Sequence, residues 1–335
     1  MKLAPRLAAL AAAAAIAFTG LTTQSARAAD ADVYTTPGGH LVNGRLWKTD
    51  CEMYSSNVVR CRTEIYAKTV VRQGGSYTTA YRWAFNNLTY LPSHRSQWAD
   101  NPLAKTGTFT SQGRQWRTEC DTPATGSGAC RSYIKTTFVA YEGGKYVTKN
   151  EFVFNNLVRF AQGSIAPVTT IPAHVIDQSR LDFNGLGPVK IGTKFSDLGL
   201  LGYADYVTSD VCEPRWRVSN FLKTRGIDPS DGDRNSSVWY VSLTKPGAKT
   251  VAGAEVGMTV GQIKALYGSS FTVVPKTNYG ETQYFGSVRD GGRELLFRAA
   301  GAGGSYAPDR ALVNSDVIVE IRAWNFADDV SYDSC

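Results

Sequence analysis

The stretch GRLWKTDCEMYSSNVVRCR, residues 44–62, recurs later in the chain as GRQWRTECDTPATGSGACR, residues 113–131. A shift of 69 residues superposes the two stretches without a gap, and 17 of the 45 positions up to the end of a shared FNNL motif are identical. So many identities at one fixed offset indicate that a supersecondary unit was duplicated. The copies occupy about 38–91 and about 107–160.

Alternation within each copy predicts β-strands. Trp47 and Cys51 are identical in the second copy, whereas the interleaved Lys48 and Asp50 keep only the sign of their charge. This pattern indicates that the first pair faces inward and the second pair faces water. Two further strands should follow, joined by a Gly-Gly turn. The last strand places its aromatic side chains on one face: Tyr77, Tyr81, Trp83 and Phe85. Each copy is therefore predicted to be a three-stranded antiparallel meander that buries its apolar face on the other copy.

Residues 1–29 are typical of a secretory signal peptide. Lys2 and Arg6 precede an apolar run at 7–21, and Ala-Arg-Ala at 26–28 is a small-x-small cleavage site. A membrane anchor is the alternative, but the apolar run is short for a bilayer span and a cleavage site follows it. We expect a secreted, extracellular mature chain without a membrane span.

Export makes disulfides the favoured interpretation of the six cysteines. The equal spacing in the two copies predicts local bridges across the first hairpin of each, Cys51–Cys61 and Cys120–Cys130. A zinc site would require closer cysteine pairs or neighbouring histidines, and none of the three histidines lies near either pair. By exclusion Cys212 pairs with Cys335, although six cysteines allow other connectivities.

The character of the chain changes at 161–180, a low-charge connector that contains two prolines. Such a stretch is the best domain boundary, and it separates a duplicated domain at 30–160 from a second domain at 181–335. The sequence therefore predicts a mostly β protein with an α+β carboxy-terminal domain. The first domain consists of duplicated, disulfide-stapled antiparallel meanders, and the second of two helix-plus-strands units.

The helices of the second domain are marked by local signals. Thr259 and Gln262 form a capping box, so a short helix should begin at Val260 and end near Gly268. A related segment places Phe195 at the start of an earlier helix. The runs SSVWYVSL, SFTVVP, ELLFRA and DVIVEIRAWN are predicted to be strands of one antiparallel sheet around these helices.

The segment VGMTVGQIKALYG, residues 256–268, resembles the helix-opening motif of the secreted domains grouped with SmpA/OmlA and with β-lactamase-inhibitory protein. This resemblance covers about 181–335. It implies two tandem helix-plus-strand units that present a sheet to a protein partner. The first domain, with its motifs WRTEC, CRS and FNNL, is similar to duplicated repeats of exported actinobacterial proteins. That resemblance implies secretion and architecture but no activity.

Charge differs between the two domains. Residues 30–160 contain 16 Lys/Arg against 10 Asp/Glu, whereas residues 161–335 contain 17 against 19. A basic, aromatic-rich exported domain suits an anionic envelope polymer, and Arg62, Arg82 and Arg131 are the candidate contacts because their register points them to water. An ordinary solvated β-surface is the favoured interpretation, since no run of basic residues is dense.

Catalytic and metal-binding signals are sparse. The chain has no G-x-S-x-G motif, and its three histidines are interpreted as surface residues. One polar cluster has the oxygen-rich spacing that opens a calcium loop: Asp228, Asp231, Asp233 and Asn235. An ordinary turn is the favoured interpretation of this cluster, with calcium as the alternative and no other cofactor expected.

These observations predict a secreted, non-catalytic binding protein that recognises an extracellular protein or an envelope polymer. Two alternatives remain from other classes. One is a cell-wall-directed hydrolase with a carboxylate pair that no motif reveals. The other is a structural component of the envelope.

Overall fold

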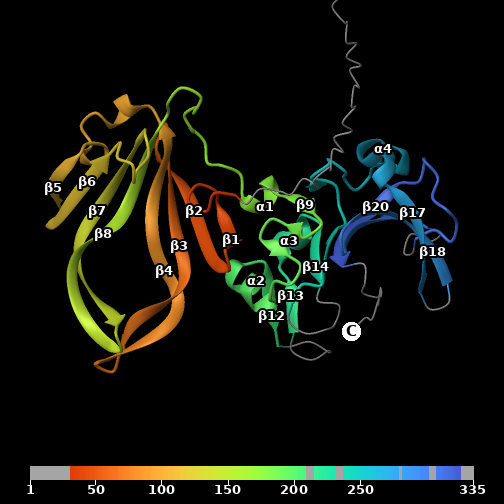
Figure 1. Ribbon diagram of the computed structural model, residues 1–335, viewed down its shortest axis with the longest axis horizontal. Helices are drawn as coiled ribbons and strands as arrows, with labels where there is room; N and C mark the ends of the chain where they lie inside the picture. Colours follow the sequence, from red (N-terminus) through yellow and green to blue (C-terminus); the bar gives the residue numbers. More distant parts are fainter. Residues whose placement is uncertain (1–30, 209–214, 231–236, 279–280, 302–306, 326–335) are drawn as a thin grey trace, which may run out of the picture.

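The structure is a computed structural model that describes residues 31–208, 215–230, 237–278, 281–301 and 307–325. The predicted signal peptide, Cys212 and Cys335 lie outside these described residues. Within them, strands dominate, and sheets of eight and six strands lie at the two ends with short helices between (Figure 1). The predicted class, mostly β with an α+β second half, is confirmed. No helix in the described part of the chain is long and apolar enough to cross a bilayer.

The first half forms an eight-stranded sheet in the order β1-β2-β3-β4-β8-β7-β6-β5. Every neighbouring pair is antiparallel except β4 and β8, which are parallel. The strands are β1 (Gly38–Val42), β2 (Arg45–Ser55), β3 (Val58–Gln73), β4 (Ser76–Ser93), β5 (Gly107–Ser111), β6 (Arg114–Cys120), β7 (Ala129–Glu142) and β8 (Lys145–Phe160).

Each half of this sheet is a meander of four strands, not the three that the sequence predicted. The additional strands, β1 and β5, are short and partly polar, so their alternation is weak in the sequence. Each turns into the next strand through two residues of positive φ, Asn43-Gly44 in one meander and Gln112-Gly113 in the other. Two consecutive positive φ values are the geometry of a tight hairpin turn. The two disulfides are confirmed, and each joins the second hairpin of its meander.

The meanders join edge to edge, which corrects the prediction that their apolar faces pack on each other. We call the side that carries the cysteines of a meander its disulfide face and the other side, which carries Arg62 or Arg131, its arginine face. Parallel pairing sets Tyr90, on the arginine face of the first meander, beside Val158, on the disulfide face of the second. On each side of the sheet, the arginine face of one meander therefore continues into the disulfide face of the other.

Beyond this pairing the long hairpins β3–β4 and β7–β8 bow apart, and their tips converge again (Figure 1). The tips meet through Tyr77 and Tyr146, whose ring centroids lie 5.8 Å apart. Both tyrosines are exposed, as is Tyr141, which packs on Tyr146.

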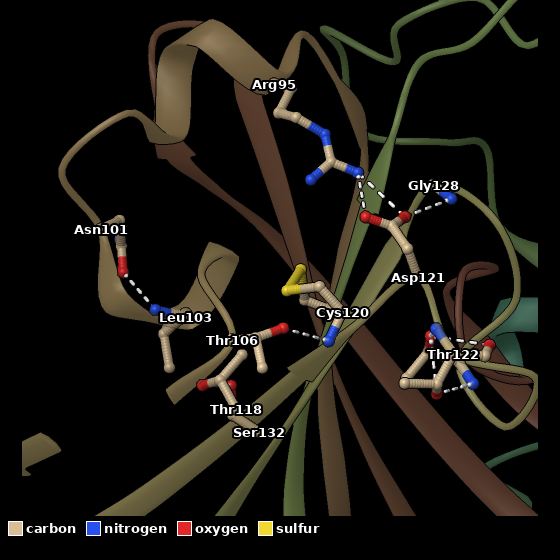
Figure 2. The surroundings of a disulfide bond; sticks show 12 residues. Arg95, Asn101, Leu103, Thr106, Thr118, Cys120, Asp121, Thr122, Gly128 and Ser132 are labelled. Carbon is tan, nitrogen blue, oxygen red and sulfur yellow. Dashed lines mark hydrogen bonds and ion pairs between the residues drawn. A yellow bond between two sulfur atoms is a disulfide. The ribbon is translucent and has the colours of Figure 1, made fainter. Parts of the chain in front are cut away.

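Short irregular segments cover the disulfides. The 3-10 helices η1 (Arg95–Trp98) and η2 (Pro102–Ala104) place Trp98 and Ala104 in one core cluster with Cys130. Figure 2 shows this region, where Thr106 accepts a hydrogen bond from the backbone N–H of Cys120 at 3.1 Å. The predicted loop between the copies is thus partly helical and shields one side of the sheet.

Four strands of the second half form a small sheet in the order β11-β10-β9-β16, and two more form a hairpin, β12-β13. The six-stranded sheet has the order β14-β15-β20-β19-β18-β17 and is antiparallel throughout. The strands are β9 (Arg180–Asp182), β10 (Gly185–Leu186), β11 (Val189–Lys190), β12 (Ala204–Val207), β13 (Arg215–Val218), β14 (Ile227–Ser230), β15 (Tyr240–Leu243), β16 (Lys249–Thr250), β17 (Thr272–Asn278), β18 (Glu281–Asp290), β19 (Arg293–Ala299) and β20 (Ile318–Asn325).

Two helices of the second half, α2 and α4, begin where the local signals predicted, and two more, α1 and α3, were not predicted. They are α1 (Val175–Gln178), α2 (Phe195–Leu201), α3 (Asn220–Thr224), α4 (Val260–Tyr267) and the 3-10 turn η3 (Gly268–Ser270). The capping box of α4 is present, because Thr259 accepts from the N–H of Gln262 and Gln262 accepts from that of Thr259. All four predicted strands belong to the six-stranded sheet, and α4 buries Val260 and Ile263 in the core shared with that sheet.

The two halves meet at β1. The hydroxyl of Tyr203, which follows α2, accepts from the N–H of Gly39 at 3.0 Å and donates to its carbonyl at 2.8 Å. Gly38 has a φ of 121°, and a Cβ there would lie 2.5 Å from the His174 ring. The two glycines therefore permit this close approach. Leu46 of β2 belongs to the same buried cluster as the helices of the second half.

We expect Tyr203→Phe to lower the free energy of unfolding by about 1–3 kcal/mol, because it leaves the buried polar groups of Gly39 without their side-chain partner. Denaturant unfolding of the mature chain measures this change. Tyr206→Phe is the control, because Tyr206 is exposed and should be neutral. Equal stability of Tyr203→Phe and wild type would show that this contact does not join the halves.

Candidate functional site

On both arginine faces, cations lie over aromatic rings, most of which belong to the last strand of the meander. In the first meander, Lys48 lies 4.7 Å from the ring centroid of Trp83 and Arg62 lies 4.9 Å from that of Phe85. The second meander repeats the arrangement with Arg117 at 5.1 Å from both Tyr133 and Phe152, and with Arg131 at 5.5 Å from Phe154. Cations within about 6 Å of a ring face are held by its quadrupole.

A β-bulge in the FNNL motif creates these pairs. Thr63 pairs with Asn87 but Glu64 pairs with Phe85, so Asn86 is an extra residue between them. The extra residue turns Phe85 from the disulfide face to the arginine face, because side chains alternate along a strand. The same shift occurs in the second meander, where Tyr133 pairs with Phe154. The aromatic side chains thus share one face, as predicted, but they lie with the arginines and not with the cysteines.

The three arginines predicted to bind a polyanion do not form one surface. Arg62 and Arg131 occupy equivalent positions, but the parallel β4–β8 pairing puts them on opposite sides of the sheet. Arg82 neighbours Trp83 in the strand and lies on the disulfide face, where its Nε donates to Thr69 at 2.9 Å. Glu151 stands at the position equivalent to Arg82.

The charge balance of the two arginine faces differs. Arg62 forms an ion pair with Glu64 at 2.6 Å. Tyr133 stands at the position equivalent to Glu64, and Arg131 has no carboxylate partner among the described residues. The Nε atom of Arg131 is buried and unbonded. The second meander also has Lys135 where the first has Tyr66, so its arginine face is the more positive one.

Coverage differs as well. Four apolar side chains of the first arginine face pack against the core of the second half: Leu41, Leu46, Tyr66 and Trp83. Their equivalents at the second meander are Thr110, Gln115, Lys135 and Phe152, none of which belongs to that core. Arg117, which pairs with Glu119 at 3.3 Å, leaves 45% of its side chain exposed. We call the uncovered set Arg117, Arg131, Tyr133, Lys135, Phe152 and Phe154 the open arginine face.

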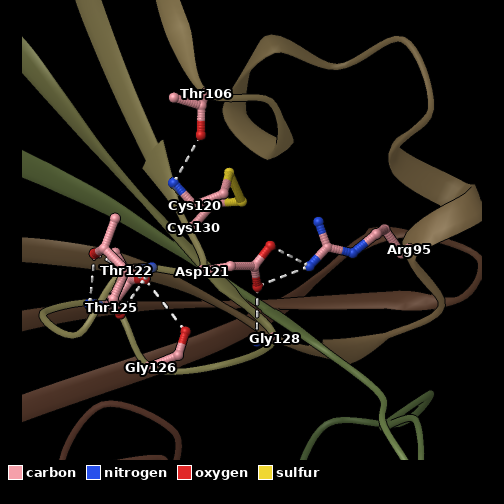
Figure 3. A network of polar contacts seen from close by, with 9 residues as sticks. All are labelled: Arg95, Thr106, Cys120, Asp121, Thr122, Thr125, Gly126, Gly128 and Cys130. Atoms are coloured by element: carbon pink, nitrogen blue, oxygen red, sulfur yellow. Dashed lines mark hydrogen bonds and ion pairs between the residues drawn. A yellow bond between two sulfur atoms is a disulfide. The ribbon is translucent and has the colours of Figure 1, made fainter.

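A separate polar network ties the loop after β6 to the segment between the meanders (Figure 3). Asp121 accepts from the N–H of Gly128 at 2.8 Å and from Arg95 at 2.9 Å. These donors, first the Gly128 N–H and then Arg95, lower the pKa of Asp121. The guanidinium of Arg95 also lies 4.0 Å from the ring centroid of Phe160. Asp121 neutralises the charge of Arg95, so this network holds the loop and offers no surplus charge to a ligand.

The structure describes only one of the four residues predicted as calcium ligands. Asp228 lies in β14, where burial raises its pKa, and its three predicted companions lie outside the described residues. Across the described part of the chain, no three His, Cys, Asp or Glu side chains are grouped so that they could hold a metal ion.

The prediction of surface histidines holds only for His94. His40 is buried and its Nε2 lies 2.8 Å from the carbonyl of Thr36. The ring of His174 packs between Tyr203 and Phe221, and burial lowers the pKa of His174. The buried His40 and the half-buried His174 therefore both lie near the junction of the halves.

One face of the six-stranded sheet contains a buried carboxylate network that the sequence analysis did not identify. Glu320 accepts from Arg322 at 2.8 Å, from Arg298 at 2.9 Å and from Ser242 at 2.6 Å. Burial alone would raise the pKa of Glu320, but Arg322, Ser242 and Arg298 outweigh it and lower the pKa to about 2. The charged residues inside the apolar runs ELLFRA and IVEIRAWN were the available signal for this network.

Glu320 should make the free energy of unfolding decrease at acidic pH. Because its pKa is lower in the folded chain than the ordinary value of 4.5, its contribution is present at neutral pH and is lost as pH falls from about 4.5 to about 2. Glu320→Gln should cost about 3 kcal/mol at pH 7 and flatten this part of the stability profile. Denaturant unfolding at several pH values checks this, with Glu281→Gln at an exposed position as the control. An unchanged acid slope in Glu320→Gln would contradict the network.

Of the residues in the open arginine face, sequence analysis singled out only Arg131. Arg117 keeps the charge of Lys48 in the repeat, and this retention was the signal that could have found it. In comparisons with known proteins, no protein family, no curated protein and no solved structure matches this chain. The open arginine face is therefore assigned from its charge, stacking and exposure.

Proposed function

We propose that this protein is a secreted binding protein that holds an anionic polymer of the cell envelope on the open arginine face. The observation that carries the proposal is the unpaired Arg131. Its equivalent, Arg62, is neutralised by Glu64, whereas Tyr133 replaces that carboxylate beside Arg131. The predicted signal peptide and the two disulfides support an extracellular setting for this interaction.

The aromatic rings under Arg117 and Arg131 hold the guanidinium groups in place for binding an anion. A guanidinium fixed over a ring has fewer conformations to lose when it binds, and its N–H groups remain available at the ring edge. Phosphate and carboxylate oxygens accept two parallel hydrogen bonds from such a group. Arg131 and Lys135 lie on the same face of β7, and Arg117 lies on the neighbouring strand β6. A row of cations across adjacent strands suits a chain with repeated negative charges.

The anionic groups are phosphates or carboxylates that repeat along a polymer. An extracellular protein partner is the competing outcome, and it is the partner implied by the resemblance of the second half to protein-binding domains. The open arginine face favours the polymer because its surplus positive charge is spread along two neighbouring strands, β6 and β7. The fully buried core of a protein interface is usually depleted of charged residues.

The test compares Arg131→Ser with its matched control Arg62→Ser in the full mature chain. Binding of polyphosphate and of polygalacturonate is measured by calorimetry between about 50 and about 200 mM salt. Arg131→Ser should weaken binding several-fold and reduce the salt slope by about 1, because one fewer counterion is released. Both variants should keep the stability of wild type within about 0.5 kcal/mol, since each residue is partly exposed.

Arg62→Ser should bind like wild type, because Arg62 already has a carboxylate partner. Equal losses in the two variants would show that binding follows net charge and not the open arginine face. Absence of binding to both polymers at low salt would overturn the proposed function. Binding that survives only with a protein captured from the producer's envelope would favour the protein partner.

A further inference from the structure

A groove of about 470 Å³ lies on the other side of the second meander, on its disulfide face. Its lining comes from three parts of the chain: Tyr54 of β2, the segment before β5, and strands β5, β6 and β8. Asn101 and Leu103 of that segment are visible in Figure 2. The volume falls within the range of about 300–1,000 Å³ that is usual for small-molecule sites.

Aromatic rings form the groove walls. The rings of Phe109 and Trp116 are stacked, with centroids 5.9 Å apart and planes within 10° of each other. Tyr54 stacks on Trp98 in the same manner, with centroids 6.2 Å apart and planes within 3°. Tyr54 is 44% exposed despite this contact. The groove therefore offers flat aromatic surfaces that are supported from behind.

Two residues of the lining carry polar atoms that have no partner. The indole Nε1 of Trp116 is a buried donor without an acceptor, and Oδ1 of Asn156 is a buried acceptor without a donor. Asn156 is itself 3% exposed. Such groups are uncommon in folded proteins, because each costs about 1–3 kcal/mol unless something pairs with it. A donor and an acceptor at one groove indicate a ligand that has hydroxyl groups.

The equivalent position in the first meander is different. Nδ2 of Asn87 donates to Thr89 at 2.8 Å, whereas Val158 replaces that threonine in the second meander. Oδ1 of Asn87 is a buried acceptor without a donor, as Oδ1 of Asn156 is, so Trp116 Nε1 is the unpartnered atom that distinguishes the second meander. Trp47, the counterpart of Trp116, has no buried unpartnered nitrogen in the described structure. Phe109 replaces His40, whose ring is held by the carbonyl of Thr36. The second meander has therefore lost the threonine that accepts from the asparagine amide nitrogen and gained an aromatic wall.

The charge of the groove excludes the polymer anion as its occupant. Asp100 is the one charged residue among the lining side chains, and Lys105 approaches its carboxylate at 3.9 Å from outside the lining. A phosphate or uronate would be repelled by Asp100 and would find no cation in the lining. An uncharged ring with apolar C–H faces and hydroxyl edges satisfies both the stacked walls and the unpartnered atoms.

We propose that this groove binds a neutral sugar ring of a glycan chain, as a second site independent of the open arginine face. The ring lies against Tyr54 and Trp116, and its hydroxyl groups pair with Trp116 Nε1 and Asn156 Oδ1. The two sites occupy opposite sides of one meander. A glycan and an anionic polymer of the same envelope can therefore be held together by the same eight-stranded sheet.

The experiment titrates the full mature chain with chitotetraose and with cellotetraose, and follows the indole N–H signal of Trp116 by NMR. We expect saturable binding of at least one tetrasaccharide and a shift of that signal. Trp116→Phe keeps an aromatic ring but removes the donor, and should weaken binding about tenfold. Tyr54→Ala should weaken binding by a similar factor without loss of folding, because Tyr54 is exposed. Trp47→Phe, the matched control, should bind like wild type.

Failure of both tetrasaccharides to bind would overturn the sugar site. Equal affinity in Trp116→Phe, Tyr54→Ala and wild type would also overturn it, because binding would then lie elsewhere. Saturable binding of a proline-rich peptide in place of the sugars would assign the groove to a protein partner. Polyphosphate titrations of the same variants separate the two proposals, because Trp116→Phe should leave polyanion affinity unchanged and Arg131→Ser should leave sugar affinity unchanged.

Discussion

The parallel pairing of β4 with β8 is the contact on which the arrangement of the first half depends. This pairing sets Tyr90, on the arginine face of the first meander, beside Val158, on the disulfide face of the second. Each side of the sheet then combines the arginine face of one meander with the disulfide face of the other. The two arginine faces therefore lie on opposite sides of the eight-stranded sheet. One arginine face packs against the second half, and the other is left open.

Differences between the copies match these surroundings. Leu41 and Leu46 are apolar where the first meander meets the second half, and their counterparts Thr110 and Gln115 are polar. Tyr133 stands where the first meander has Glu64, so the uncovered arginine face also has one negative charge fewer. Residues that are identical in both copies maintain the frame, and residues that differ determine which meander packs against the second half and which keeps its arginine face open.

Local signals made much of the fold predictable. The disulfides followed from spacing, and the start of α4 followed from the capping box at Thr259. The edge-to-edge junction was not predictable, because strand pairing between distant segments leaves no trace in periodicity. The bulge at Asn86 was also not predictable from the sequence. One extra residue in a strand reverses which side chains face which side of the sheet, and the sequence analysis had assumed an unbroken alternation. For this reason the sequence grouped Arg82 with Arg62, although the two lie on opposite faces of their meander.

The central claim is that one missing carboxylate makes the second arginine face a polyanion site. Tyr133→Glu restores that carboxylate beside Arg131 and so reproduces the pair that Arg62 forms with Glu64. The most direct measurement is the affinity of this single variant of the mature chain for polyphosphate at low salt. The account predicts a loss larger than that caused by Thr137→Glu, which adds the same charge at an exposed position further along β7. Equal losses in the two variants would contradict it, because the site would then respond only to overall charge.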